Sequence, residues 1–293
     1  MPSNATRLRA LLAGPDMVIA PGAYDGITAR LIDQAGFPAV YMTGAGTAAT
    51  YGYPDYGLLT MSEMVDNAGR IVRAVGVPVI ADADTGYGNE LNVVRTVREY
   101  EQRGVAALHL EDQGFPKKCG HLDDKEIIPR EDWLAKIRAA AGARDNADFL
   151  IIARTDSRAV IDFDEAIARA NAALAAGADM VFVEAPQTLE EVAAIPKLVK
   201  GPCLLNVVWG GKTPDLDLND AQAMGYRLAI VPGMLFKAAM TACDAALAQL
   251  KAEHRHPVPT NRLTVREAFA RVGAAEWDDL RTRFRDTPAK AAE

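Results

Sequence analysis

The sequence predicts a single (β/α)8 barrel, the TIM-barrel fold of the α/β class, followed by additional C-terminal helices. A length of 293 residues suits one barrel. Short runs rich in Val, Ile and Leu recur along the chain, and each is followed by a longer segment with helical periodicity. An open, doubly wound sheet is the alternative, but eight repeats of strand and helix favour a closed barrel.

The predicted strands are continuously apolar, which is typical of parallel strands covered on both faces. In chain order they span residues 17–20, 39–42, 77–81, 106–110, 149–153, 180–183, 203–207 and 228–231. The helices between them have recognisable ends. Thr60 and Thr264 each begin a capping-box pattern, in which a Glu follows three residues later. The alanine-rich helix over 164–176 ends before Gly177, a typical C-cap residue.

We predict two parts of the chain: a catalytic barrel over residues 1–251 and a C-terminal helical extension over residues 252–293. Residues 264–284 have the pattern of one or two amphipathic helices, which a barrel does not need for closure. They are expected to cover one barrel end or to pack on a neighbouring subunit. Residues 286–293 are expected to be frayed.

The composition excludes several classes of function. A net charge of -7 disfavours nucleic acid and anionic membranes as partners. The first ten residues contain no apolar run of signal length, and no later segment stays apolar for the roughly 18 residues of a membrane span. We therefore expect a cytoplasmic protein. Three widely spaced cysteines, Cys119, Cys203 and Cys243, indicate neither a disulfide framework nor a zinc site.

Acidic residues gather where predicted strands end, and in a barrel these positions line one mouth. Asp82 and Asp84 follow strand three, and strand alternation predicts that they project to the same side, roughly 7 Å apart. Two such carboxylates repel each other unless a cation or proton lies between them, and oxygen ligands suit Mg²⁺ or Mn²⁺. Strand four ends in Glu111 and Asp112, of which alternation lets only one join the pair. The alternative is that these acids cap helices or pair with basic residues.

Three more strands end in polar residues, namely Arg154, Glu184 and Asn206. The guanidinium of Arg154 matches the geometry of a carboxylate and is a candidate clamp for an anionic substrate. Spacing alone supports equally well a structural role for Arg154 as partner of Glu184 or Asp156.

The segment from Gly114 to His121 forms an unusually long connection after strand four, and long loops at the active end of a barrel often act as lids. Cys119 lies in it between Lys117, Lys118 and His121. Such cationic surroundings are expected to lower the pKa of a thiol. Cys119 is therefore a candidate proton donor or base, the alternative being an exposed cysteine without a role.

From about residue 19 to 251 the sequence resembles the isocitrate lyase and phosphoenolpyruvate mutase superfamily. The resemblance is to its short-chain branch, with methylisocitrate lyase, 2,3-dimethylmalate lyase, oxaloacetate hydrolase and the petal death protein. Its most specific element is the run Lys-Lys-Cys-Gly-His at 117–121, which is similar to the lyase signature of the family. The resemblance implies that Asp82 contacts Mg²⁺ directly, while Asp55, Asp84 and Glu111 hold it largely through water. It thus favours Glu111 over Asp112.

The resemblance also assigns the substrate contacts and the catalytic set. Thr43, Gly44 and Ala45 match the loop that holds the substrate carboxylate. The remaining substrate contacts are Tyr41, Arg154, Glu184 and Asn206, with Asp55 nearby. The catalytic set is Cys119, Arg154, His121, Lys117 and Lys118.

The activity implied is Mg²⁺-dependent cleavage of the bond between C2 and C3 in a 2-methylisocitrate or 2-alkylmalate type di- or tricarboxylate. In this retro-aldol reaction Cys119 protonates the departing enolate. Hydrolysis or decarboxylation of oxaloacetate in the same site is the nearest alternative. The segment Trp209 to Pro214 and the pair Gly233 and Met234 do not match one subgroup of the family, so the identity of the substrate stays open. The resemblance also implies that mutases and hydrolases of phosphonates lack the cysteine motif, which argues against phosphonate chemistry. A non-catalytic barrel is disfavoured because it would not need so many ligand-type residues at its strand ends. The resemblance further implies a homotetramer in which the C-terminal helix is exchanged between subunits.

Overall fold

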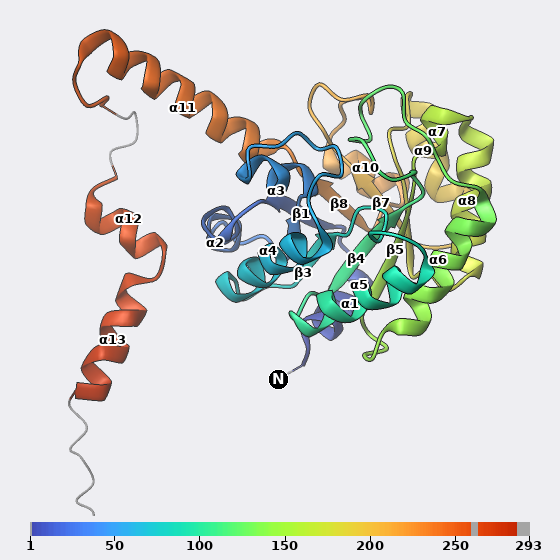
Figure 1. The fold of residues 1–293 in the computed structure, drawn as a ribbon, viewed down its shortest axis with the longest axis horizontal. Coiled ribbons are helices and arrows are strands. Elements are labelled where there is room, and N and C mark those ends of the chain that lie inside the picture. Colours follow the sequence, from blue (N-terminus) through green and yellow to red (C-terminus); the bar gives the residue numbers. More distant parts are fainter. Residues whose placement is uncertain (1, 259–262, 286–293) are drawn as a thin grey trace, which may run out of the picture. The chain divides into compact units, whose positions relative to one another are not determined.

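A computed structural model of the protein describes residues 2–258 and 263–285. Within them, eight parallel strands close into a barrel in chain order, with β8 pairing to β1, which confirms the predicted fold (Figure 1). The strands are β1 Val18–Ala23, β2 Val40–Met42, β3 Val79–Asp82, β4 Ala107–Glu111, β5 Leu150–Thr155, β6 Met180–Val183, β7 Cys203–Asn206 and β8 Leu228–Val231.

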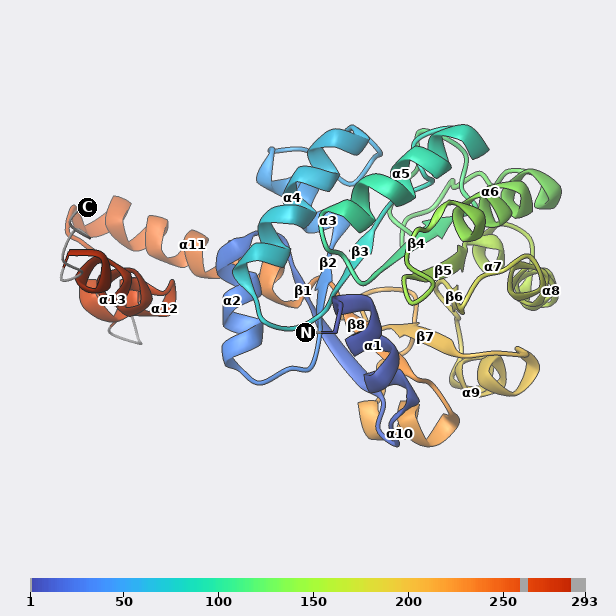
Figure 2. The ribbon, with the colours of Figure 1, turned by 90° about the horizontal axis from the view of Figure 1, so that it is seen from below.

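Helices surround the sheet (Figure 2). They are α1 Asn4–Ala13, α2 Gly26–Gln34, α3 Gly44–Thr50, α4 Met61–Ala74, α5 Glu90–Gln102, α6 Arg130–Ala143, α7 Ser157–Val160, α8 Phe163–Ala175, α9 Leu189–Leu198 and α10 Leu218–Met224. After β8 the chain continues in α11 Met234–Glu253, α12 Val265–Arg271 and α13 Ala274–Arg285. The capping boxes at Thr60 and Thr264 are both present. Helix α8 stops one residue earlier than predicted, with Ala176 rather than Gly177 at its C-cap.

Several strands extend further toward their carboxyl ends than the apolar runs predicted. Asp82, Glu111 and Arg154, expected just beyond or at the limit of the strands, lie within β3, β4 and β5. The reason is that backbone pairing continues past the apolar residues, since Asp82 pairs with His109 and Glu111 with Arg154. Polar side chains at these positions are tolerated because they meet charged partners inside the barrel mouth.

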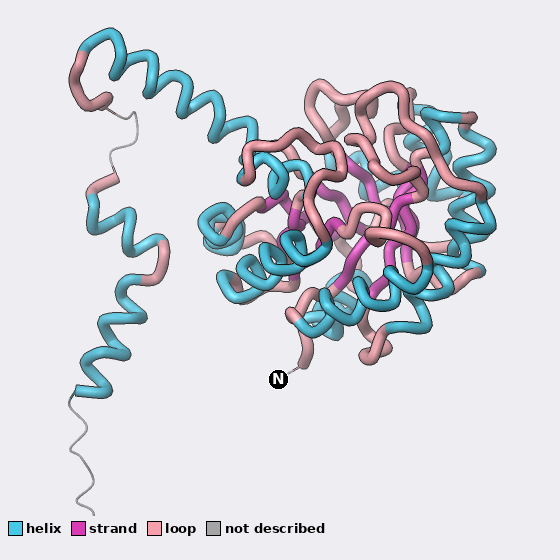
Figure 3. The backbone as a smooth tube through the Cα atoms, in the orientation of Figure 1, coloured by secondary structure: helices cyan, strands magenta, loops and turns pink. Residues whose placement is uncertain are grey.

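The side chains inside the barrel change from apolar to charged toward the carboxyl ends of strands such as β3 and β5. Ile80 and Ile152 belong to a buried cluster that includes residues of most strands. Two residues further on, and therefore on the same face of each strand, come Asp82 and Arg154. Leu8 of α1 packs in the same cluster, so α1 closes the amino end of the barrel. The loops that follow the strands gather over the opposite, carboxyl end (Figure 3).

Helix α3 was not expected. Thr43, Gly44 and Ala45 were predicted to be loop, but the helix begins at Gly44, and the Thr43 side chain accepts a hydrogen bond from the Gly46 amide as its N-cap. The short, weakly apolar sequence Gly-Ala-Gly-Thr-Ala-Ala-Thr shows no helical periodicity, which explains why pattern reasoning missed it.

The chain divides into two compact units, one up to Ala238 and one from Ala239 onward, and this division falls inside α11. The second unit contains α12 and α13. The predicted boundary at residue 251 also lies in α11 and stays a prediction, while the expected fraying of residues 286–293 falls outside the described residues. No helix among the described residues is both long and apolar enough to cross a membrane.

Candidate active site

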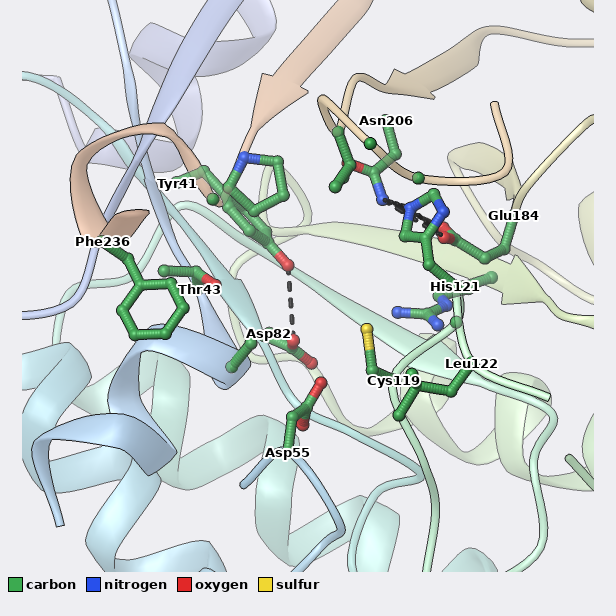
Figure 4. Close-up of a pocket in the computed structure, with 18 of the residues that line it drawn as sticks. Tyr41, Thr43, Asp55, Asp82, Cys119, His121, Leu122, Glu184, Asn206 and Phe236 are labelled. Carbon is green, nitrogen blue, oxygen red and sulfur yellow. Dashed lines mark hydrogen bonds and ion pairs between the residues drawn. The ribbon is translucent and has the colours of Figure 1, made fainter. Parts of the chain in front are cut away.

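A cavity of about 290 Å³ opens at the carboxyl end of the barrel. Figure 4 shows side chains from several strand ends and from the loop after β4 converging on it. Of the residues that the sequence singled out, those lining the cavity are Tyr41, Thr43, Ala45, Asp55, Asp82, Cys119, His121, Arg154, Glu184 and Asn206. Residues far apart in the sequence are thus brought to one small space.

Asp82 is held by donors from three parts of the chain. Its carboxylate accepts hydrogen bonds from the Tyr41 hydroxyl (3.4 Å), the Gly44 amide (3.2 Å) and the Asp84 amide (3.0 Å). A Cβ atom at Gly44 would lie 2.4 Å from the Asp82 carboxylate, so this approach requires glycine. Burial opposes ionisation, but the charges of His109, Lys117 and other neighbours outweigh it and lower the pKa of Asp82 to about 2.

Lys117 is buried among acidic side chains. Its ammonium lies 2.6 Å from Asp55 and 2.8 Å from Asp84. Although burial favours the neutral amine, the charges of Asp55, Asp84 and Glu111 raise the pKa of Lys117 well above its usual range. Burial, with the charges of Asp82 and Asp55, raises the pKa of Asp84 to about 6 despite this ion pair. Several carboxyl groups therefore share the one ammonium of Lys117.

Asp84 reaches this cluster by a route that strand alternation did not predict. It lies two residues beyond the end of β3 and has a φ of 46°, in the left-handed region. The backbone turn, rather than the pleat of a strand, therefore directs its side chain. The expected proximity to Asp82 is present, but the reason given for it was wrong.

Adjacent acids at the end of β4 point in opposite directions. Glu111 lies inside the barrel, where one oxygen is 3.0 Å from the Arg154 guanidinium. Asp112 points outward and accepts hydrogen bonds from the Thr155 hydroxyl (2.6 Å), the Asp156 amide (2.8 Å) and Arg169 (3.2 Å). Glu111, not Asp112, thus joins the acids at the mouth, as the resemblance implied.

The acidic residues at the barrel mouth offer oxygen atoms, the ligands that a hard divalent cation prefers. Asp55, Asp82, Asp84 and Glu111 surround the single ammonium of Lys117. Both oxygens of Glu111 are buried without a hydrogen bond among the described residues, and burial raises its pKa well above the usual range. In the described ranges no group of three or more acidic, histidine or cysteine side chains is placed so that it could hold a metal ion by itself. A magnesium ion that keeps most of its waters needs only one or two direct carboxylates.

Arg154 is fixed on several sides. Its guanidinium contacts Glu111 and bonds to Asp156 through Nε (2.9 Å) and Nη2 (3.2 Å). The aromatic ring of Phe182 lies beneath it, with the guanidinium carbon 5.2 Å from the ring centre. Arg154 is therefore presented to the cavity in one orientation. Both roles considered from the sequence are compatible, because the structural partner, Asp156, leaves the guanidinium at the cavity wall.

His121 and Glu184 contact each other at the cavity wall. His121 Nε2 lies 3.0 Å from Glu184, and His121 Nδ1 accepts a hydrogen bond from the Lys212 amide (3.0 Å). Because Nδ1 accepts, the ring proton of the neutral form lies on Nε2, where it can be donated to Glu184. Asn206 donates from Nδ2 to both oxygens of Glu184.

The surroundings of Cys119 differ from the expected cationic setting. Burial and the charge of Asp55 raise the pKa of the thiol, so the predicted lowering was wrong. The three neighbouring cations are engaged elsewhere: Lys117 with acids, His121 with Glu184, and Lys118 with the Asp124 carbonyl. Figure 4 shows the sulfur directed into the space bordered by Asp82 and His121. The thiol therefore stays protonated at neutral pH.

Lys118 was placed in the catalytic set, but the structure does not bring its ammonium to the cavity. Its backbone is instead clamped by Gln113, whose side chain bonds to both the amide (3.0 Å) and the carbonyl (2.8 Å) of Lys118. Sequence reasoning also missed Lys125, whose buried ammonium contacts Asp156, and His109, which bonds to Tyr41 inside the barrel. An ionisable residue within an apolar run was the available signal for His109.

Known proteins share both sequence and fold with this chain. The sequence model of the phosphoenolpyruvate phosphomutase family matches residues 8–251. A 2,3-dimethylmalate lyase from Eubacterium barkeri is 52% identical over 78% of this chain and 80% of its own length. A 2-methylisocitrate lyase from Aeropyrum pernix is 43% identical over 98% of this chain and 92% of its own length.

Solved structures extend this likeness. A 2,3-dimethylmalate lyase superposes with a TM-score of 0.93 at 38% identity, covering 100% of this chain and 99% of its own. An oxaloacetate acetylhydrolase bound to the inhibitor 3,3-difluorooxalacetate superposes with a TM-score of 0.93 at 36% identity, covering 98% of this chain and 99% of its own. A phosphonopyruvate hydrolase solved with oxalate and Mg²⁺ superposes with a TM-score of 0.88 at 30% identity, covering 97% of this chain and 100% of its own.

Proposed function

Because this chain belongs to the phosphoenolpyruvate mutase and isocitrate lyase superfamily and is a carbon-carbon lyase of its methylisocitrate and dimethylmalate lyase branch, we propose that it cleaves a 2-alkylmalate or 2-methylisocitrate type acid. The bond between C2 and C3 breaks, giving pyruvate or a related 2-keto acid and a second carboxylate. The observation that carries this proposal is a protonated thiol, Cys119, in the same small cavity as Asp82 and Arg154.

The proton and electron changes suit the residues present. Loss of the 2-hydroxyl proton turns C2 into a carbonyl, and the electrons of the broken bond pass to the departing carbon. Asp55 and Glu184, carboxylates that line the cavity, are the available proton acceptors. The Cys119 thiol then gives its proton to the departing carbanion. A thiol that holds its proton at neutral pH is matched to this task.

Substrate carboxylates are bound by groups that the fold holds still. Arg154 offers a fixed guanidinium at the cavity wall, whose planar fork matches a carboxylate. The Thr43 hydroxyl and the start of α3 border the same space. Because these groups lie at strand ends rather than on free loops, they hold the reacting carbon at a fixed position relative to the thiol.

We assign Mg²⁺ to the acidic cluster, with Asp82 as direct ligand and Asp55, Asp84 and Glu111 holding it largely through water. The gathering of four carboxyl groups and the oxygens of Glu111 that lack a hydrogen bond among the described residues support this assignment. When bound, the ion stabilises negative charge that develops on the substrate oxygens.

Hydrolysis of oxaloacetate is the second candidate, supported by the likeness to oxaloacetate acetylhydrolase at 36% identity. The same cavity and cation would serve it. Phosphonate chemistry is less favoured because the Lys-Lys-Cys-Gly-His run at 117–121 resembles the signature of the lyases.

A panel of acids tests the proposal. The purified protein is incubated with Mg²⁺ and 2,3-dimethylmalate, 2-methylisocitrate or oxaloacetate, and 2-keto acid release or loss is followed. In D2O the departing acid gains one deuterium at the former C3. Release of oxalate and acetate from oxaloacetate would favour the hydrolase. Absence of turnover on every acid contradicts both candidates.

We also propose a homotetramer that exchanges its C-terminal helices. Support comes from large apolar side chains in the second unit that are exposed in the single chain, including Val265, Phe269 and Trp277. Deleting residues from 264 onward is expected to disrupt assembly in sedimentation. A truncated chain that still sediments as a tetramer would contradict this.

A further inference from the structure

Lys125 lies near the end of the loop that joins β4 to α6, and its side chain is 1% exposed. Its ammonium donates to the Gly120 carbonyl and to Asp156 Oδ1, at 2.8 Å for the latter. A buried ammonium is costly unless it is paired and hydrogen-bonded, so these partners specify its place. The Gly120 carbonyl directly follows Cys119 in the chain.

Asp156 joins this ammonium to Arg154. One of its oxygens accepts from both Lys125 and Arg154 Nη2, while the other accepts from Arg154 Nε at 2.9 Å. Arg154 in turn contacts Glu111. A continuous chain of charge-assisted contacts therefore runs from the loop backbone beside the thiol to the acids at the barrel mouth.

The loop also packs directly on the same groups. A Cβ atom at Gly120 would lie 2.5 Å from Arg154 Nη2 and 2.5 Å from Glu184 Cγ. If Lys125 only balanced the charge of Asp156, it would not need to reach the loop backbone as well. Its second contact, with the Gly120 carbonyl, points to a mechanical link between the loop and the guanidinium.

We propose that Lys125 is a positioning residue that holds the loop carrying Cys119 and the guanidinium of Arg154 as one unit. The consequence for catalysis rests on the proposed function, in which these two groups act on one substrate. Without the link, the loop opens more often and Arg154 loses a constraint through Asp156. The thiol then meets the substrate carbon less often in the reactive geometry.

Cys119 alkylation by iodoacetamide tests the link without any substrate. A Cys243→Ser background removes the exposed cysteine, and Cys203 is buried, so the reaction reports on Cys119. In Lys125→Met we expect the alkylation rate to rise about tenfold or more, as losing a charge-assisted hydrogen bond makes the open loop more populated. We expect kcat to fall by about 100-fold, with KM changed much less.

Arg144→Met is the matched control. Arg144 also bonds to one carboxylate and one backbone carbonyl, those of Asp179 and Phe149, but at the amino end of the barrel. The Arg144→Met variant should have lower thermal stability than the parent but the same rate of Cys119 alkylation. If Lys125→Met does not fold, Lys125→Gln replaces it, because the amide keeps a donor without the charge, and the alkylation rate should still rise.

The proposal is overturned if either Lys125 variant is less stable than the parent but keeps the parent's rate of Cys119 alkylation and the parent's kcat. If the parent turns over none of the acids, the proposed function fails, yet the alkylation rates still decide whether Lys125 holds the loop.

Discussion

At the amino end of the barrel, Asp179 is fully satisfied: Arg9 contacts one of its oxygens at 2.8 Å and Arg144 the other at 2.6 Å. At the carboxyl end, Glu111 has a guanidinium contact but no hydrogen bond within the part of the chain that the structure describes. All charges of the first arrangement are paired within the chain, whereas the second leaves carboxyl oxygens that a ligand can contact. Conventional barrel enzymes divide stability and chemistry between their two ends in this way.

The largest effect is expected at the carboxyl end. Cys119→Ser replaces the thiol by a much weaker acid of similar size, so kcat for the lyase reaction should fall by about 1,000-fold, within the usual range for a lost general acid. Steady-state kinetics measure this loss, and thermal unfolding should match the parent. A serine variant with near-parental kcat would remove Cys119 from the proposed proton transfer.

A smaller effect is expected for the metal. Asp84→Asn should weaken Mg²⁺ binding by about 10- to 100-fold, as for other residues that hold a metal indirectly. Titration calorimetry measures the affinity. Asp112→Asn is the control, because burial raises the pKa of both acids to about 6 while Asp112 points outside the barrel. Equal losses in both variants would contradict the assignment.

The amino end should show the reverse pattern. Arg144→Met removes two charge-assisted hydrogen bonds, and we expect the free energy of unfolding to fall by about 1–2 kcal/mol. Urea denaturation measures it. Because Arg144 lies far from the cavity, kcat and KM should stay at parental values, and a change in either would weaken the contrast between the two ends.

A further prediction concerns the pH dependence of stability. The folded pKa of Asp84, about 6, lies above the unfolded value of about 3.9. Its stabilising contribution is therefore full below about pH 4 and is lost as pH rises through 6. In EDTA, Asp84→Asn should gain stability relative to the parent between pH 4 and 7, as followed by urea denaturation. Saturating Mg²⁺ should reduce this gain, because the ion favours the ionised carboxylate.

The barrel was predictable because each strand is a continuous apolar run that needs cover on both faces. The mouth was partly predictable, since strand ends meet there: Asp82, Arg154, Glu184 and Asn206 do line one cavity. Pattern reasoning failed where the backbone leaves regular geometry, as at Asp84 with its left-handed φ. It failed again at Cys119, because sequence neighbours do not reveal that Lys117 and His121 contact acids from other loops of the barrel.

Two glycines set a practical limit on redesign of this enzyme. Any larger residue at Gly44 would displace the Asp82 carboxylate, and any at Gly120 would displace Arg154. Variants made to accept bulkier acids should therefore keep both positions and vary apolar walls such as Val208 and Phe236. Substrate range can then change at one side of the cavity while the reactive groups on the other keep their spacing.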